Sequence, residues 1–199
     1  MALYGAYQRV TTGNVQTTVD SSTTPLNGPP KQPLGTIYSP PINVGLATAT
    51  GQGLPPVYKY VQYNSTSNPS VVAAPAPVYY TDETFTIVTG AASEAYVTTA
   101  GVSVAGYLMP NTTALSTLTA ALLNGNWVWI QVAGFLKGAW GPTTGGGVSD
   151  LIVGLTTGSW ASSGVGSASA SRVLAVQLTA VASSVCDVLV GGQGVFLGS

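Results

Sequence analysis

The sequence predicts a mainly β protein: an antiparallel β-barrel or β-sandwich with one short helix and a long extended N-terminal arm. Three observations lead to this fold class. Short segments rich in Val, Tyr and Thr recur about every 8 to 15 residues, with Gly, Asn, Ser or Pro between them. Helical spacing is clear at one place only. Eight of the 13 prolines fall within residues 1–56.

The arm spans residues 1–56 and the β domain spans residues 57–199. The prolines of the arm, together with many Gly, Thr and Asn residues, prevent a continuous helix or a long strand. An extended segment without a core must bury its apolar side chains on another surface. We expect that surface to be a neighbouring chain, with the arm's own domain as the alternative. The candidate contact residues in the arm are Tyr4, Tyr7, Arg9, Leu34, Ile37 and Tyr38.

The strands of the β domain follow from period-two alternation and from the turn residues between segments. They are predicted over 57–63, 77–80, 84–89, 94–108 (one or two strands around Gly101), 126–134, 135–140 and 150–157. Residues 158–171 are rich in Gly and Ser and are predicted to form a loop. Residues 172–181 and 184–190 form a predicted hairpin, with Ala182 and Ser183 near its turn.

One helix is predicted, over residues 111–123. Leu115, Leu118 and Leu122 follow the i, i+3, i+7 spacing of one helical face. Asn111 can cap the first turn, and the Asn-Gly pair that follows the segment can end the helix. This helix is the one exception to the β pattern of the domain.

The stretch NGNWVWIQVAG (124–134) carries large side chains on both faces of its predicted strand. The interior set is Val128, Ile130 and Val132, and the outer set is Trp127, Trp129 and Gln131. A strand in an antiparallel sheet commonly needs only one apolar face. We therefore expect a second layer over the two tryptophans, formed by the helix, the arm or a neighbouring subunit. Trp127 and Trp129 are accordingly candidate contact residues.

Composition and charge narrow the classes of function. Charged residues make up 6% of the chain, with five Lys or Arg, six Asp or Glu and a net charge of -1. The basic residues are scattered, which argues against binding to nucleic acid. The sequence predicts neither a transmembrane helix nor a signal peptide, so no membrane partner is expected. Low charge with many aromatic residues suits extensive contact between proteins.

Residues that could carry chemistry are few. The chain has no histidine, and its one cysteine, Cys186, lies in an apolar run and is predicted to be a core residue. We recognise no catalytic triad, zinc site or phosphate-binding loop, so we predict no catalytic residue, metal or cofactor. Asp82 or Glu83 paired with Glu94 could serve a glycosidase. Asp82 and Glu83 are better interpreted as turn residues between two strands.

From about residue 57 to residue 190 the order of features resembles that of head decoration (cement) proteins of tailed bacteriophages, of the small β-barrel type. The residues that carry the resemblance are YKYVQYNSTSNPS, PVYYTDETFTIVT, AGVSVAGYL, GNWVWIQVAG and VLAVQLTAVASSVCDVLVGG. The resemblance covers about two thirds of the chain and does not include the arm. It implies a β-barrel or β-tulip domain in a virion protein, commonly a homotrimer on the outer capsid surface. It also implies contact with the major capsid protein, synthesis in the host cytoplasm and no catalysis.

The alternative is a receptor- or glycan-binding module of a phage fibre or similar appendage. Exposed aromatic side chains can stack on sugar rings, and Trp160 in the predicted Gly/Ser loop or Trp140 is the candidate for such a contact. Ligand sites also need polar groups to orient the ligand, and only Gln131 shares the predicted face of the two tryptophans. Trp160 is therefore a candidate contact residue under either interpretation.

Overall fold

The structure, a computed structural model, describes residues 33–39, 56–64, 75–98, 101–108, 125, 127–141, 148, 151–154, 160–163 and 173–191. Within these residues the chain is mainly β, as the sequence predicts, and its one helical element is a short 3-10 turn, η2 (Ala92–Glu94). The helix predicted over 111–123 lies outside the described residues, as does most of the arm. The fold is therefore argued from the strands.

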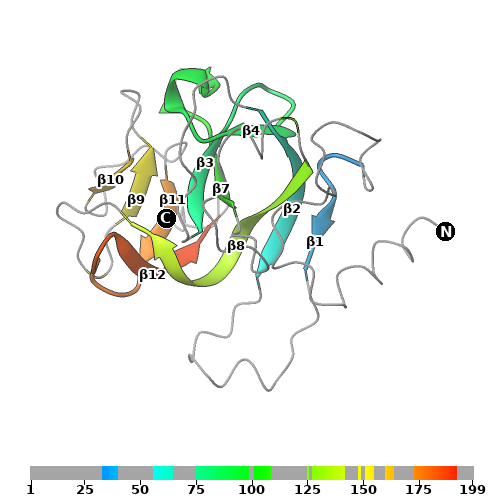
Figure 1. The fold of residues 1–199 in the computed structure, drawn as a ribbon. Helices are drawn as coiled ribbons and strands as arrows, with labels where there is room; N and C mark the ends of the chain where they lie inside the picture. The colour runs from blue at the N-terminus through cyan, green and yellow to red at the C-terminus, as the bar shows by residue number, and fades with distance from the viewer. Residues whose placement is uncertain are drawn as a thin grey trace, which may run out of the picture.

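Five strands close into a barrel (Figure 1). In the order in which they pair, they are β2 (Val57–Tyr63), β4 (Ile87–Thr89), β3 (Ala76–Tyr80), β7 (Val104–Leu108) and β8 (Trp127–Trp140). β8 also pairs with β2, which closes the ring. The pairings are antiparallel except that between β2 and β4, which is parallel. The predicted barrel is confirmed, with one parallel pair that the sequence did not indicate.

Alternation along the strands decides which side chains fill the barrel. Val128 and Ile130 of β8 are buried in its core, and Val132 packs against them, on the interior face that the sequence predicts. The other buried members of this core are Val61, Tyr63, Val78, Tyr80, Val88, Ala105 and Leu108. Fully burying one Val, Leu or Ile side chain contributes about 1.5 to 3 kcal/mol. The barrel is therefore held mainly by hydrophobic packing.

The second half of β8 continues into a second sheet. Its further strands are β12 (Val185–Val190), β11 (Val173–Gln177), β9 (Leu151–Gly154) and β10 (Trp160–Ser163), in that order. Tyr79 and Tyr107, on the outer side of β3 and β7, share a core with Leu136 and Leu174 of this sheet. The Tyr107 hydroxyl donates a hydrogen bond to the Trp140 carbonyl oxygen, 3.2 Å away. The architecture is a barrel and a sandwich that share β8.

β8 serves both halves because it curves between them (Figure 1). Gly134 has a φ of 91°, in the left-handed region that favours glycine. The side chain of Gln131 is 1% exposed, and its Nε2 donates to the carbonyl oxygens of Ala133, Gly134 and Phe135 at 3.2, 3.3 and 3.0 Å. One amide group thus fixes the local backbone. The two predicted strands 126–134 and 135–140 are consequently one strand.

The predicted hairpin over 172–181 and 184–190 is confirmed. β11 and β12 pair antiparallel, and Ala182 and Val185 exchange two backbone hydrogen bonds of 2.9 Å around a two-residue turn. Ser183 and Ser184 in this turn have φ values of 51° and 62°. Positive φ at both central residues is typical of a type I′ turn, whose twist matches that of the paired strands.

The loop predicted over 158–171 is wrong at residues 160–163, where β10 pairs with β9. This Ser-rich segment lacks apolar alternation, so its strand depends on the backbone hydrogen bonds that β9 supplies. The strand predicted over 84–89 forms only at β4, because a turn comes first. In that turn, Oδ1 of Asp82 accepts hydrogen bonds from the backbone N and the hydroxyl of Thr84, at 3.0 and 2.6 Å.

The predicted strand region 94–108 contains three short strands. β5 (Val97–Thr98) and β6 (Gly101–Val102) form a separate two-stranded sheet, and β7 belongs to the barrel. The sequence predicts one or two strands here, and the structure has three, the second of which begins at Gly101. Val97, in this small separate sheet, is 60% exposed, whereas most valines of the barrel are buried.

Candidate functional site

An aromatic cluster covers the outer side of β2 and β8. It consists of Leu34, Tyr38, Tyr58, Tyr60, Trp127 and Trp129, and we call these six residues the aromatic face. Four of them are contact residues predicted from the sequence. The centre of the aromatic face is buried, with Tyr60 at 0%, Trp129 at 7% and Tyr38 at 9% exposure. The other three residues are half-buried and form its rim.

The cover over Trp129 is a piece of the arm. β1 (Ile37–Tyr38) pairs antiparallel with β2, and the Tyr38 ring meets the Trp129 ring edge-on, with centroids 6.5 Å apart and planes at 68°. The Tyr60 ring lies 5.0 Å from Trp129 at 52°. The backbone N of Gly35 donates to the Tyr60 carbonyl oxygen at 2.8 Å, and the N of Tyr60 donates to the Thr36 carbonyl oxygen at 2.9 Å. For residues 33–39, the arm therefore packs on its own domain.

The other predicted contact residues do not join the aromatic face. Ile37 is 57% exposed and lines a pocket together with Lys59, its partner on β2. Trp160 is the first residue of β10, an edge strand, and its side chain lies outside the described residues. Tyr4, Tyr7 and Arg9 also lie outside the described residues. The structure thus brings together four of the nine predicted residues.

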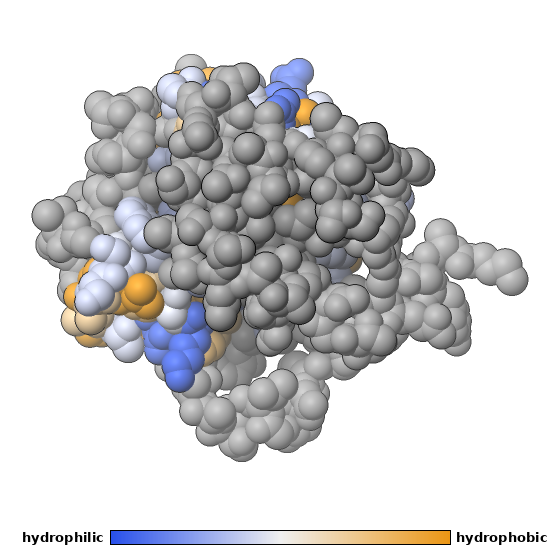
Figure 2. All heavy atoms as spheres, in the orientation of Figure 1, coloured by the Kyte–Doolittle hydropathy of each residue, from blue (hydrophilic) through white to orange (hydrophobic). Residues whose placement is uncertain are grey.

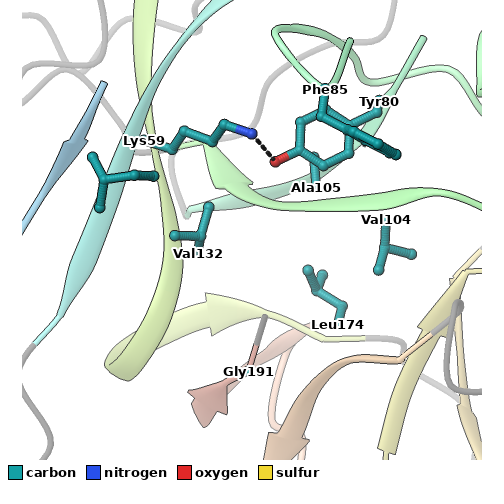
Figure 3. A pocket seen from close by; sticks show the side chains of 9 residues that line it. Lys59, Tyr80, Phe85, Val104, Ala105, Val132, Leu174 and Gly191 are labelled. Atoms are coloured by element: carbon teal, nitrogen blue, oxygen red, sulfur yellow. Dashed lines mark hydrogen bonds between the residues drawn. The ribbon is translucent and has the colours of Figure 1, made fainter. Parts of the chain in front are cut away.

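The pocket beside Lys59 has a volume of about 290 Å³ (Figure 3). Its lining residues are Ile37, Lys59, Tyr80, Phe85, Val104, Ala105, Val132, Leu174 and Gly191. They come from β1, four barrel strands, the turn after β3 and the second sheet. Because these segments meet only in the folded chain, sequence analysis missed the pocket. Its walls are apolar except at Lys59 and Tyr80.

Lys59 and Tyr80 form the polar end of the pocket (Figure 3). The lysine Nζ donates a hydrogen bond to the Tyr80 hydroxyl oxygen at 3.1 Å and lies 4.8 Å from the centroid of its ring. Burial lowers the pKa of Lys59 below its usual value and raises the pKa of Tyr80 to about 12. Because the pKa of Tyr80 is far above 7, its side chain is a neutral phenol at neutral pH.

Among the described residues, Asp82, Glu94 and Cys186 contribute to local structure. The interpretation of Asp82 as a turn residue is confirmed by its hydrogen bonds to Thr84. Glu94 accepts a hydrogen bond from the Thr89 hydroxyl at 2.6 Å. Cys186 is a buried core residue, as predicted, and burial raises the pKa of its thiol to about 11. The described residues contain no group of three or more side chains that could hold a metal ion.

The folding stability should fall steeply at alkaline pH. Burial, assisted by Tyr38, raises the pKa of Tyr58 from 10.0 to about 12, and burial alone raises that of Tyr80 equally far. Since the unfolded chain ionises first, the stabilisation is fully present below pH 10 and is lost as the pH rises through 12. Each tyrosine accounts for on the order of 2 kcal/mol. Lys59, whose pKa burial lowers, acts in the opposite direction and only up to pH 10.5.

Urea unfolding at a series of pH values checks this expectation, with tryptophan fluorescence as the signal. The Tyr58→Phe variant, which cannot ionise at this position, should lose less stability than the wild-type chain between pH 10 and pH 12. A free energy of unfolding that stays constant across this interval would contradict the expectation.

Two features therefore qualify as candidate sites: the aromatic face and the Lys59 pocket. In the part of the chain that the structure describes, no helix has the length and apolar character needed to cross a membrane. In comparisons with known proteins, no family model, no curated protein and no solved structure matches this chain.

Proposed function

We propose that this chain is a structural virion protein: a decoration (cement) protein that binds the outer surface of a tailed-phage head. It would stabilise the shell through contacts with the major capsid protein and with sister copies in a homotrimer. The observation that carries the proposal is the aromatic face, where four residues expected to make contacts lie together. Its rim residues Leu34, Tyr58 and Trp127 remain half-buried in the single chain.

The aromatic face has the anatomy of an adhesive surface. Tyr60 and Trp129 are buried and their rings are in contact, so they form a rigid support beneath the rim residues. The rim residues should therefore lose little conformational entropy when a partner covers them. Aromatic residues that are partly desolvated before binding commonly dominate the affinity of protein interfaces. This supports attachment to a protein surface through the outer side of β2 and β8.

The low charge of the chain agrees with permanent attachment. With 11 charged residues among 199, the chain has little electrostatic repulsion between copies and little long-range steering. Among the coloured residues in Figure 2, strongly hydrophilic ones form only small, separate areas. Attachment would therefore depend on contact area and would resist added salt.

A glycan-binding role receives less support from the geometry. Sugar sites combine aromatic rings with polar groups that orient the ligand. On β8 the polar group next to the tryptophans is Gln131, which is buried and donates to three carbonyl oxygens. On β2 the Nε2 of Gln62 donates to the Gly125 carbonyl oxygen at 3.2 Å. Both amide groups are thus engaged with the backbone.

Electron microscopy of virions labelled with an antibody against this chain tests where the protein acts. The proposal expects label distributed over the outer surface of the head. Label confined to the tail fibres would contradict it and would favour the receptor-binding alternative.

Co-sedimentation with heads prepared without this chain tests the aromatic face. We expect Trp127→Ala to weaken binding about tenfold, because a tenfold loss corresponds to about 1.4 kcal/mol, which is within the range of one interface aromatic. Val97→Ala, at an exposed position on β5, is the matched control and should bind as the wild-type chain does. Equal binding by the Trp127→Ala variant would exclude the aromatic face as the contact.

A further inference from the structure

We propose that the Lys59 pocket gives the chain a second role and binds a small monocarboxylate with an apolar tail. The carboxylate would accept hydrogen bonds from Lys59 and Tyr80, and the tail would occupy the apolar part of the 290 Å³ cavity (Figure 3). The pocket and the aromatic face lie on opposite sides of β2. The two proposals are therefore independent.

The polar end presents hydrogen-bond donors to an anion. The Lys59 ammonium has three N–H groups, and the contact of 3.1 Å to the Tyr80 oxygen uses one of them. Because the Tyr80 oxygen accepts from Lys59, its own hydroxyl hydrogen can be donated to a ligand. Hydrogen bonds from an ammonium group to a carboxylate are about twice as strong as those between neutral groups. An anion that lies beside both side chains would thus be bound by charge-assisted contacts.

The described carboxylates do not neutralise this lysine. None of the four lines the pocket. Asp82, Glu94 and Asp187 accept hydrogen bonds from Thr84, Thr89 and the backbone N of Gly138, and Glu83 is exposed. Placing a cation against apolar walls costs free energy unless an opposite charge accompanies it. A carboxylate ligand would supply that charge, and a neutral ligand of the same shape would not.

The apolar end sets the size of the ligand. Its walls are the side chains of Ile37, Phe85, Val104, Ala105, Val132 and Leu174. An apolar cavity of about 150 Å³ holds one benzene molecule, so 290 Å³ accommodates about ten to twelve non-hydrogen atoms. Octanoate, with about ten, is the probe that matches both the volume and the charge.

Phe85 is held against the pocket in an unusual backbone conformation. Its φ is 53°, in the left-handed region that bulky residues rarely adopt. The Phe85 ring meets the Tyr80 ring edge-on, with centroids 5.1 Å apart and planes at 79°. Such strain persists where surrounding structure enforces it, and it is frequent at ligand sites. The strained turn therefore positions one wall of the pocket beside its hydroxyl donor.

Titration calorimetry on the full chain tests the proposal, with sodium octanoate and 1-octanol as the two probes. On the wild-type protein, octanoate should bind at least about tenfold more tightly than octanol, because only octanoate pairs with Lys59. This comparison needs no substitution. Absence of octanoate binding, or equal affinity for the two probes, would overturn the proposal.

Two lysine variants locate the site. Lys59→Met keeps the length of the side chain and removes its charge, and it should weaken octanoate binding at least about tenfold. Lys137→Met is the matched control, because Lys137 is an exposed lysine on β8 that does not line the pocket. The Lys137→Met variant should bind octanoate with the affinity of the wild type. Equal loss in both variants would show that octanoate recognises surface charge rather than this pocket. Circular dichroism verifies that each variant is folded.

Discussion

The Trp129→Ala variant should lose about 3 to 5 kcal/mol of folding free energy, the range found when a buried tryptophan is truncated. Trp129 is 7% exposed and lies between Tyr38 and Tyr60, whose ring centroids are 6.5 and 5.0 Å away. Removing the indole leaves a cavity beneath β1 that two rigid rings cannot fill. Urea unfolding followed by far-ultraviolet circular dichroism measures the loss.

The neighbouring Trp127→Ala variant separates a structural role from a contact role. Trp127 is half-buried at the rim of the same face, so its truncation should cost only about 1 kcal/mol of stability. Its larger effect is expected in the binding of phage heads. If Trp129→Ala instead left the fold unchanged and dissociated oligomers, Trp129 would belong to a contact between subunits and the cover by β1 would be unimportant.

The outcome of these two variants follows from a pattern that the sequence already contained. The alternation in residues 124–134 predicted the interior and outer sets of β8, and the structure confirms both faces. β2 likewise has the predicted bounds of residues 57–63, because seven residues alternate without a turn signal. Local pattern thus predicted both strands, although the outer face of each is also partly buried, by the aromatic cluster.

Other parts of the fold depend on partners distant in sequence. The parallel pairing of β2 with β4 and the strand at residues 160–163 are products of tertiary context, which local propensity does not encode. The sequence places Gln131 on the outer face with the two tryptophans, but it does not indicate that the Gln131 amide fixes the bend of β8. The covering of Trp129 by the arm was one of three predicted alternatives, and only long-range pairing decides among them.

The Lys59 pocket could not be predicted for a similar reason. In the sequence, Lys59 is one of five scattered basic residues. It lies in a strand of alternating character. Its hydroxyl partner Tyr80 is 21 residues away, and Leu174 comes from the second sheet. One feature of the sequence could have indicated the pocket. Lys59 lies two residues before Val61 and four before Tyr63, so the alternation places a charged residue on the interior face of the strand. A charge on an interior face is a reason to look for a ligand.

The Gly106→Ala variant should be destabilised by at least about 3 kcal/mol, at the upper end of the cost of overpacking. A Cβ on Gly106 would overlap the carbonyl oxygen of Gln131 and lie 3.2 Å from its carbonyl carbon. That backbone cannot retreat easily, because Gln131 is paired with Tyr58 on β2 and with Tyr107 on β7. Thermal unfolding and urea unfolding should both report the loss.

Gly35→Ala is the control that separates close packing from backbone conformation. Gly35 has a φ of 84°, and a Cβ there would lie 3.7 Å from the Thr86 side chain, an ordinary contact. Its substitution should therefore cost only the left-handed penalty of about 1 to 2 kcal/mol. A loss at Gly106 no larger than at Gly35 would mean that β7 and β8 can separate. Since β8 and its partner β2 build both the aromatic face and the pocket, a distinctly larger loss would tie both sites to closure of the barrel.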